Sequence, residues 1–224
     1  PLIIPTLSQA INVTAIPHKL YHIPNQNSLG KYNSSFGDQF YYVAPKANTT
    51  QKNNIVFGKP SNIIDTDEML HLIRTNKNHE VDQVAYIRAR LFDMLIGDWD
   101  KQAKNWRWAV FQEKNKVIYK PIPINRDQAF AKYDGAFLKL LKTVPEMGQM
   151  HSYSYNYPNP KKFNAEVYAL DLALLASVDE KLWKEQAQYI QEHLTNDIIN
   201  KAFLELPYEL QDETTSKLKL YLRN

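Results

Sequence analysis

Residues 97–106 read GDWDKQAKNW, and residues 125–130 read NRDQAF. Asp100 and Asn105 stand five positions apart, just after a stretch whose apolar residues recur at helical spacing. Asp127 follows two short apolar runs that are separated by a turn. The predicted order is therefore a helix, a loop that carries a carboxylate and an amide, a β-hairpin, and a second loop that carries a carboxylate.

This order suits phosphoryl transfer, which depends on positioned charge more than on covalent help from the protein. Asp100 is the candidate catalytic residue, because a carboxylate beside an attacking hydroxyl accepts or orients its proton. Asn105 and Asp127 are the candidate metal ligands, because Mg²⁺ and Mn²⁺ bind oxygen donors. Lys104 and Arg126 are candidate contacts to the nucleotide. A salt bridge between Arg126 and a neighbouring carboxylate fits the sequence equally well.

The composition predicts a folded domain and excludes several kinds of site. The chain has 224 residues, of which 44% are hydrophobic, enough for one large domain or two small lobes. The net charge of +3 is small and dispersed, which argues against nucleic acid as the main partner. Cysteine is absent, so thiol catalysis, cysteine-bound zinc and disulfides are excluded.

The sequence also bears on location and completeness. No apolar run reaches the roughly 18 residues that a membrane span needs. The chain opens at Pro1 without a signal peptide or an initiator Met. We therefore expect an excerpt of a longer protein with covalently linked neighbouring domains. Composition leaves the compartment open.

The periodicity predicts a mostly helical α+β fold. Phe40 to Val43 is the best strand in a front part that is rich in Tyr, Asn and Pro. Pro121 and Pro123 are expected to end the hairpin that precedes Asp127. The expected helices, with Asp65 or Thr66, Asp179 and Thr195 as caps, cover residues 7–11, 66–76, 81–96, 163–177, 180–193, 195–204 and 208–222, and residues 145–160 form a loop.

Several conspicuous residues have structural interpretations. Trp106 and Trp108 alternate along one strand, which places both on one face and favours the core over a ligand-stacking surface. Asp98 is expected to cap the turn after the helix rather than to bind a ligand. The arginines of that helix are expected to pair within the protein, Arg88 or Arg90 with Asp93 or Asp98.

Residues 98–106 and 121–130 resemble the atypical kinases of the spore-coat CotH type and the secretory-pathway casein kinases, with HipA-like kinases as more distant relatives. The resemblance implies a protein-kinase-like C-terminal lobe with a small β-containing N-terminal part. It implies ATP and Mg²⁺ or Mn²⁺ as cofactors and a hydroxyl-bearing protein or small molecule as acceptor. Residues 1–60 would be a remnant of the N-terminal lobe or hinge and residues 61–224 the catalytic lobe, unless 1–224 is one continuous domain.

The chain as a whole also resembles a module of Bacteroidetes-type surface or outer-membrane proteins, through residues 89–100, 194–196 and 218–220. That resemblance implies a periplasmic or outer-membrane-associated location, with the cytoplasm as the alternative.

Two departures from the kinase pattern keep a second function open. Lys101 and Gln102 stand where these kinases usually carry Arg and His. None of the six glycines is expected to form a loop that would cover phosphates, and no candidate sheet with a phosphate-binding Lys precedes Pro1. The alternative is a catalytically inactive kinase-like module for binding or scaffolding. A phosphoesterase ranks last, since the His-rich ligand set of such sites is missing.

Overall fold

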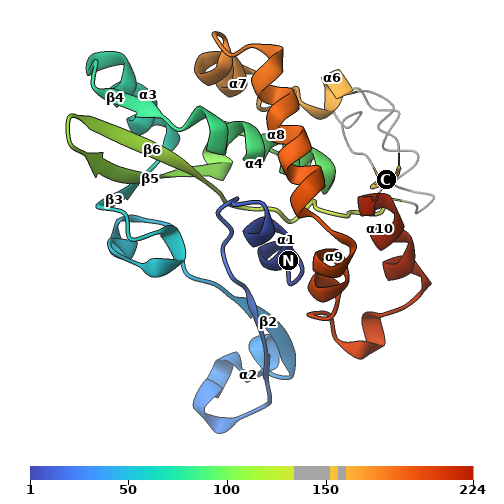
Figure 1. The fold of residues 1–224 in the computed structure, drawn as a ribbon. Coiled ribbons are helices and arrows are strands. Elements are labelled where there is room, and N and C mark those ends of the chain that lie inside the picture. Colours follow the sequence, from blue (N-terminus) through green and yellow to red (C-terminus); the bar gives the residue numbers. More distant parts are fainter. Residues whose placement is uncertain (134–151, 156–159, 224) are drawn as a thin grey trace.

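The computed structural model describes residues 1–133, 152–155 and 160–223. Its architecture is α+β and mostly helical, as predicted (Figure 1). A four-stranded sheet has the order β3-β5-β6-β4, with bounds Asn62–Ile64, Trp106–Glu113, Lys116–Pro123 and His79–Val81. Strands β3, β5 and β6 pair antiparallel, whereas β4 pairs parallel to β6.

Helix α4 (Gln83–Leu95) is the central helix of the described fold. It begins where the Asp82 side chain accepts a hydrogen bond from the Ala85 N–H at 2.9 Å, and it ends before Gly97, whose φ of 74° turns the chain out of the helix. Its buried face includes Tyr86 and Phe92, and it packs against β6 and α8 (Glu180–His193). The predicted helix over 81–96 is confirmed, with a start two residues later.

The centre of the core is aromatic. The rings of Trp106 and Trp108 lie 6.2 Å apart, and the Tyr86 ring lies 5.0 Å from that of Trp106. All three side chains are fully buried. The core interpretation of the two tryptophans is confirmed, because alternate residues of β5 point to the face that α4 covers.

Strand β6 runs further than the sequence predicted. Pro121 lies inside it, and Pro123 is its last residue, so the strand ends at the second of the two prolines. The Ile124 N–H donates to the Asn105 carbonyl at 2.9 Å, and bonded and non-bonded pairs alternate along an antiparallel ladder. Both prolines therefore occupy positions that need no N–H toward β5, and β4 covers only residues 117–119 of the opposite edge.

Several of the helices begin at a side-chain cap. Asp65, Asp179 and Thr195 accept the capping hydrogen bonds predicted for them. Within the described residues, the helices besides α4 and α8 are α1 (Ile4–Ala10), α2 (Asn33–Phe36), α3 (Thr66–Thr75), α6 (Pro160–Phe163), α7 (Tyr168–Leu175), α9 (Asn196–Phe203) and α10 (Glu213–Arg223).

Two C-terminal helix predictions need correction. The expected helix over 163–177 is broken after Phe163. The Asn164 side chain ends the first turn, because it donates to the Pro160 carbonyl and accepts a hydrogen bond from Arg90 at 2.7 Å. The last helix begins at Glu213 rather than 208, since Pro207 and a short 3₁₀ turn precede Asp212, which caps it. Most of the predicted loop over 145–160 falls outside the described residues.

A separate β-hairpin extends away from these elements (Figure 1). Its strands are β1 (Lys19–Ile23) and β2 (Gln39–Val43), the second of which was predicted. Among the described helices, none has both the length and the apolar character required to cross a lipid bilayer.

Candidate functional site

The candidate site lies where the chain leaves α4 and where it leaves β6. The loop over 98–105 follows the helix, and a short 3₁₀ turn (Ala103–Asn105) leads it into β5. The segment that follows β6 returns to the same place, because the Phe130 N–H donates to the Ile96 carbonyl at 2.8 Å and the Ile124 N–H donates to Asn105. Backbone hydrogen bonds alone therefore bring together the two stretches, 97–106 and 125–130, that the sequence identified.

The three predicted oxygen donors differ in exposure. Asn105 is only 4% exposed, and its Oδ1 accepts the Gln102 backbone N–H at 3.3 Å. Because an amide oxygen has two lone pairs, one acceptor position of Asn105 remains. Asp127 is exposed and accepts a 3.3 Å hydrogen bond from its neighbour Gln128. Asp100 is half-buried and accepts from the Gln102 side chain at 3.4 Å.

The Tyr133 phenol lies near two of these donors, Asp100 and Asp127. Burial raises the pKa of its phenol, and the nearby carboxylates of Asp127 and Asp100 raise it further. Its hydroxyl bonds to Oε1 of Gln128, and its ring lies 6.4 Å from that of Trp99. Asp100 and Asp127 thus share one acidic neighbourhood beside Tyr133. Tyr133 could not be identified from the sequence, since neither its spacing nor its flanks fit a motif.

Lys101 fixes the first loop to the second. Its side chain is 1% exposed, and Nζ lies 2.5 Å from Oδ2 of Asp98. The same ammonium donates to the carbonyls of Ile124 and Asn125 at 3.4 and 3.3 Å, three and two residues before Asp127. By its position in the sequence, Lys101 departs from the kinase pattern. In the structure it is an internal cation that binds both loops.

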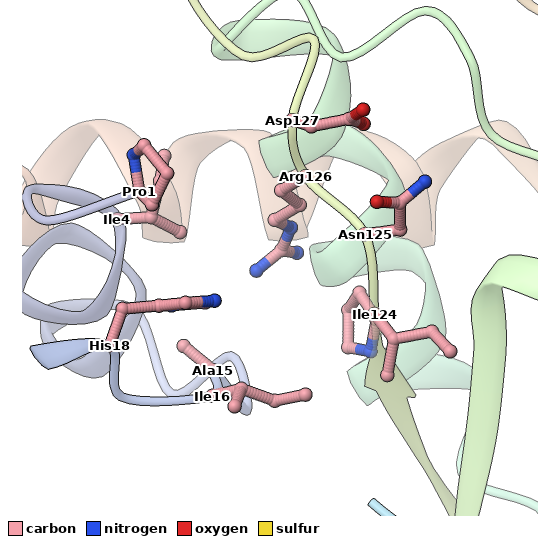
Figure 2. Close-up of a pocket in the computed structure, with 10 residues that line it drawn as sticks. Pro1, Ile4, Ala15, Ile16, His18, Ile124, Asn125, Arg126 and Asp127 are labelled. Carbon is pink, nitrogen blue, oxygen red and sulfur yellow. The ribbon is translucent and has the colours of Figure 1, made fainter. Parts of the chain in front are cut away.

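A second buried cation fixes the same segment from the other side. Arg126 donates from Nε to Oδ1 of Asp93 at 2.9 Å and reaches the Ser8 hydroxyl at 3.4 Å. Figure 2 shows its guanidinium directed toward the α1 side, while Asp127 points away from it. Of the two interpretations of Arg126, the ion pair with a neighbouring carboxylate is the one observed. Lys104 is exposed, and no ion pair is formed by its side chain within the described part of the chain.

These groups belong to a buried charge cluster beneath the site. We use this name for Arg90, Asp93, Asp98, Lys101, Arg126 and Asp171. Arg90 lies 3.7 Å from Asp93 and 3.0 Å from Asp171, so the pairing predicted for this helix is observed. Three cations and three carboxylates balance, and Tyr86 donates its hydroxyl to Asp171 at 2.8 Å. Balanced pairing is the condition under which charges persist in a protein interior.

Asp98 is the most perturbed carboxyl of the cluster. Burial raises its pKa from 3.8 to about 6, and the adjacent Lys101 ammonium opposes that rise. A folded-state pKa above the unfolded value means that the folded protein binds this proton more tightly. The contribution of Asp98 to the free energy of unfolding is therefore greatest below pH 3.8 and is lost as the pH rises through about 6.

We expect an NMR titration to show this directly. The ¹³C carboxyl shift of Asp98, identified by its absence from an Asp98→Asn variant, is expected to titrate with a midpoint near pH 6. Exposed Asp67, in the first turn of α3, serves as the comparison carboxyl in the same spectra. A midpoint for Asp98 equal to that of Asp67 would contradict the burial that the structure assigns to it.

A small cavity adjoins the exit of β6 (Figure 2). Its volume is about 120 Å³, and it lies between α1, the segment at Ala15 to His18, and residues 123–127. Pockets that enclose a whole ligand of drug size usually measure about 300–1,000 Å³. This cavity therefore has room for part of a nucleotide at most.

The donor set fits a hard divalent cation of the Mg²⁺ type. Carboxylate and amide oxygens are its usual protein ligands, and Mg²⁺ commonly takes only one or two of them together with waters and substrate phosphates. Asn105 has a free acceptor position and Asp127 is accessible, so both meet this requirement. Throughout the described ranges, no group of three His, Asp or Glu side chains is placed to hold a metal ion by itself. Such a site would bind the cation together with phosphates.

Solved structures similar to this chain include the following two. One is the Helicobacter pylori proinflammatory kinase CtkA, at 11% identity, a TM-score of 0.49, and coverage of 99% of this chain and 78% of that one. The other is a chain of the HipA, HipB and operator DNA complex of Shewanella oneidensis MR-1, at 12% identity, a TM-score of 0.44 and coverage of 99% and 53%. This chain thus spans about half of the second. Both are similarities of overall fold. No protein-family model and no curated protein matches the chain.

Proposed function

We propose that this chain is the catalytic lobe of a kinase-like phosphotransferase that, in a longer protein, transfers the γ-phosphoryl group of ATP to a hydroxyl acceptor. The observation that carries the proposal is the joining of the Asp-x4-Asn loop to the segment before Asp127. Lys101 and the Asn105 carbonyl make that connection through contacts to residues 124 and 125. A loop that merely capped a helix would not need a buried cation that binds the backbone of a distant segment.

Each site residue has a separate proposed role. Asp100 orients the acceptor hydroxyl and receives its proton. Asn105 and Asp127 hold Mg²⁺ or Mn²⁺, which when bound neutralises charge on the nucleotide phosphates. Lys104, exposed between Asp100 and Asn105, is the remaining candidate for a phosphate contact, since Arg126 is paired with Asp93.

Calorimetric titration of ATP in the presence of Mn²⁺ tests the proposal. Asp127→Asn is expected to weaken Mn²⁺-dependent nucleotide binding about tenfold or more, because it removes the one charged ligand proposed for the ion. The matched control is Asp67→Asn, which neutralises an exposed carboxylate on α3. Equal affinities of the two variants, or no binding by the full-length protein, would remove the proposal.

The second candidate is a kinase-like binding or scaffolding module without catalysis, placed at a bacterial surface. The specific observation in its favour is that Asn105 Oδ1 and the Arg126 guanidinium already have partners inside the protein. Retained Mn²⁺ binding without transfer of labelled phosphate from ATP, in the full-length protein, would favour this second candidate. Transfer that Asp100→Asn abolishes would favour the first. For either function, we propose an extracytoplasmic location.

A further inference from the structure

The cavity between α1 and the exit of β6 contains a buried cation with an unused donor. The Arg126 side chain is only 7% exposed. Its Nε donates to Asp93 at 2.9 Å and its Nη1 reaches the Ser8 hydroxyl at 3.4 Å, whereas Nη2 is buried and has no hydrogen-bond partner among the described residues. A buried N–H group without a partner is costly, so this nitrogen indicates a ligand that the cavity can hold.

His18 brings a second unused donor to the same space. Figure 2 shows its ring and the Arg126 guanidinium pointing toward one another across the cavity. The His18 Nδ1 is also buried and has no hydrogen-bond partner in the described part of the chain. Either nitrogen of a neutral imidazole can donate, depending on the tautomer. Two unused nitrogens, one from the segment after α1 and one from the segment after β6, therefore face one cavity.

The size and lining of the cavity restrict the ligand. A volume of about 120 Å³ corresponds to the share of about four water molecules, or to one ion of about five non-hydrogen atoms. Much of the remaining lining is apolar, as at Ile4 and Ile16. Among the lining side chains, the only carboxylate is that of Asp127, and it points away from the guanidinium (Figure 2). The cavity thus offers donors to a small ligand that carries acceptors.

We propose that this cavity binds a single tetrahedral oxyanion of the size of phosphate, between Nη2 of Arg126 and Nδ1 of His18. A guanidinium is always charged and can only donate, and its hydrogen bonds to an anion are roughly twice as strong as bonds between neutral groups. The two nitrogens lie on opposite sides of the cavity. A tetrahedral anion presents oxygens in both directions, whereas a planar carboxylate presents its two oxygens to one side. The inference does not depend on catalysis or on nucleotide binding.

NMR titration of the full-length protein with inorganic phosphate, without nucleotide or metal, tests the proposal. The Arg126 Nε–H signal and the His18 ring signals are expected to shift together, with a dissociation constant of about 1 mM. The affinity is modest because the buried charge cluster is already balanced without the anion. The other five histidines are the internal comparison. Chloride at equal ionic strength is expected to cause no such shift, and acetate is expected to bind more weakly than phosphate.

Two substitutions outside the buried charge cluster locate the site. Ala15→Met fills the cavity without changing a charge, and His18→Ala removes one donor, so each is expected to raise the dissociation constant for phosphate about tenfold or more. Their controls are Ala44→Met and His71→Ala, at exposed positions that do not line the cavity. Both controls are expected to bind phosphate like the wild type.

Arg126→Lys keeps a cation beside Asp93 but removes Nη2, so it is expected to abolish the His18 shift. If this variant does not fold, as judged by tryptophan fluorescence, Ala15→Met and His18→Ala still decide the question. A wild type without phosphate-dependent shifts would overturn the proposal, as would shifts that Ala15→Met leaves unchanged or acetate binding as tight as that of phosphate. Mg²⁺ with ATP is expected to leave the phosphate affinity unchanged. Competition would assign the cavity to the nucleotide and so overturn a separate anion site.

Discussion

Replacing Lys101 with methionine is expected to lower the free energy of unfolding by about 3–5 kcal/mol. Methionine has a similar length and fills the same space, so the loss comes from charge rather than from a cavity. Asp98 would remain fully buried without its ammonium partner, and the carbonyls of Ile124 and Asn125 would lose their common donor. Urea unfolding followed by tryptophan fluorescence measures the loss, since Trp106 and Trp108 are buried in the core.

The pH dependence of this loss identifies its cause. Without Lys101, the pKa of Asp98 is expected to rise further, so protonation relieves part of the cost at low pH. The deficit of Lys101→Met relative to the wild type should therefore be larger at pH 8 than at pH 5. The double variant Lys101→Met with Asp98→Leu should recover much of the stability, because neither charge is then left unpaired.

Lys116→Met is the matched control for this prediction. Lys116 pairs with Glu80 at 2.8 Å, but both side chains are about half exposed. Exposed pairs contribute only about 0–1 kcal/mol, so the control should lose little stability. If Lys101→Met proved no less stable than Lys116→Met, the buried anchor between the two loops would be refuted.

The parts of the fold that local chemistry controls could be predicted from the sequence. Asp65, Asp179 and Thr195 cap their helices through bonds to the backbone three residues on, which needs no tertiary information. Trp106 and Trp108 are buried because strand alternation puts them on one face. The strand–loop order around Asp127 likewise follows from periodicity.

The support of the site could not be predicted in the same way. Lys101 contacts carbonyls more than twenty positions away, and Arg126 meets Asp93 over a similar separation. A guanidinium suits phosphate and carboxylate equally well, so only the packing of the β6 exit against α4 decides between them. Pro121 was expected to end the strand, but it lies inside β6 because its position opposite Trp108 needs no N–H toward β5, and this depends on the register of the β5–β6 pair. Register is a property of the folded pair, not of either segment.

Asp93→Asn is expected to be the second most damaging single change, with a loss of about 3 kcal/mol or more in the free energy of unfolding. The Asp93 side chain is completely buried between Arg126 at 2.9 Å and Arg90 at 3.7 Å. Asparagine preserves the shape but removes the charge. Arg90 keeps Asp171 as a partner, whereas the structure gives Arg126 no other carboxylate among the described residues.

This asymmetry separates a structural role from a positioning role. Arg126 immediately precedes Asp127, so an Arg126 released from Asp93 lets the proposed metal ligand move. Asp93→Asn should therefore weaken Mn²⁺-dependent nucleotide binding by about 10–100-fold, as the loss of outer support does in known metal sites. Asp171→Asn removes the partner of Arg90 and of the Tyr86 hydroxyl but does not touch Arg126. It should lower stability with no loss of affinity per folded molecule.

The comparison is made at a temperature at which both variants remain folded, as judged by tryptophan fluorescence. Asp93→Asn and Asp171→Asn each remove one carboxylate partner of Arg90 and so destabilise the interior in the same way. A difference in Mn²⁺ affinity between the two variants therefore reports the contact of Asp93 with Arg126. Equal affinities for Asp93→Asn and Asp171→Asn would mean that Arg126 does not position Asp127, even if both variants were destabilised. A loss of Mn²⁺ affinity in Asp93→Asn but not in Asp171→Asn would show that the buried charge cluster supports the site as well as the fold. The Asp93 carboxylate, which pairs with Arg90 of α4, would then also hold the segment after β6 in place through Arg126.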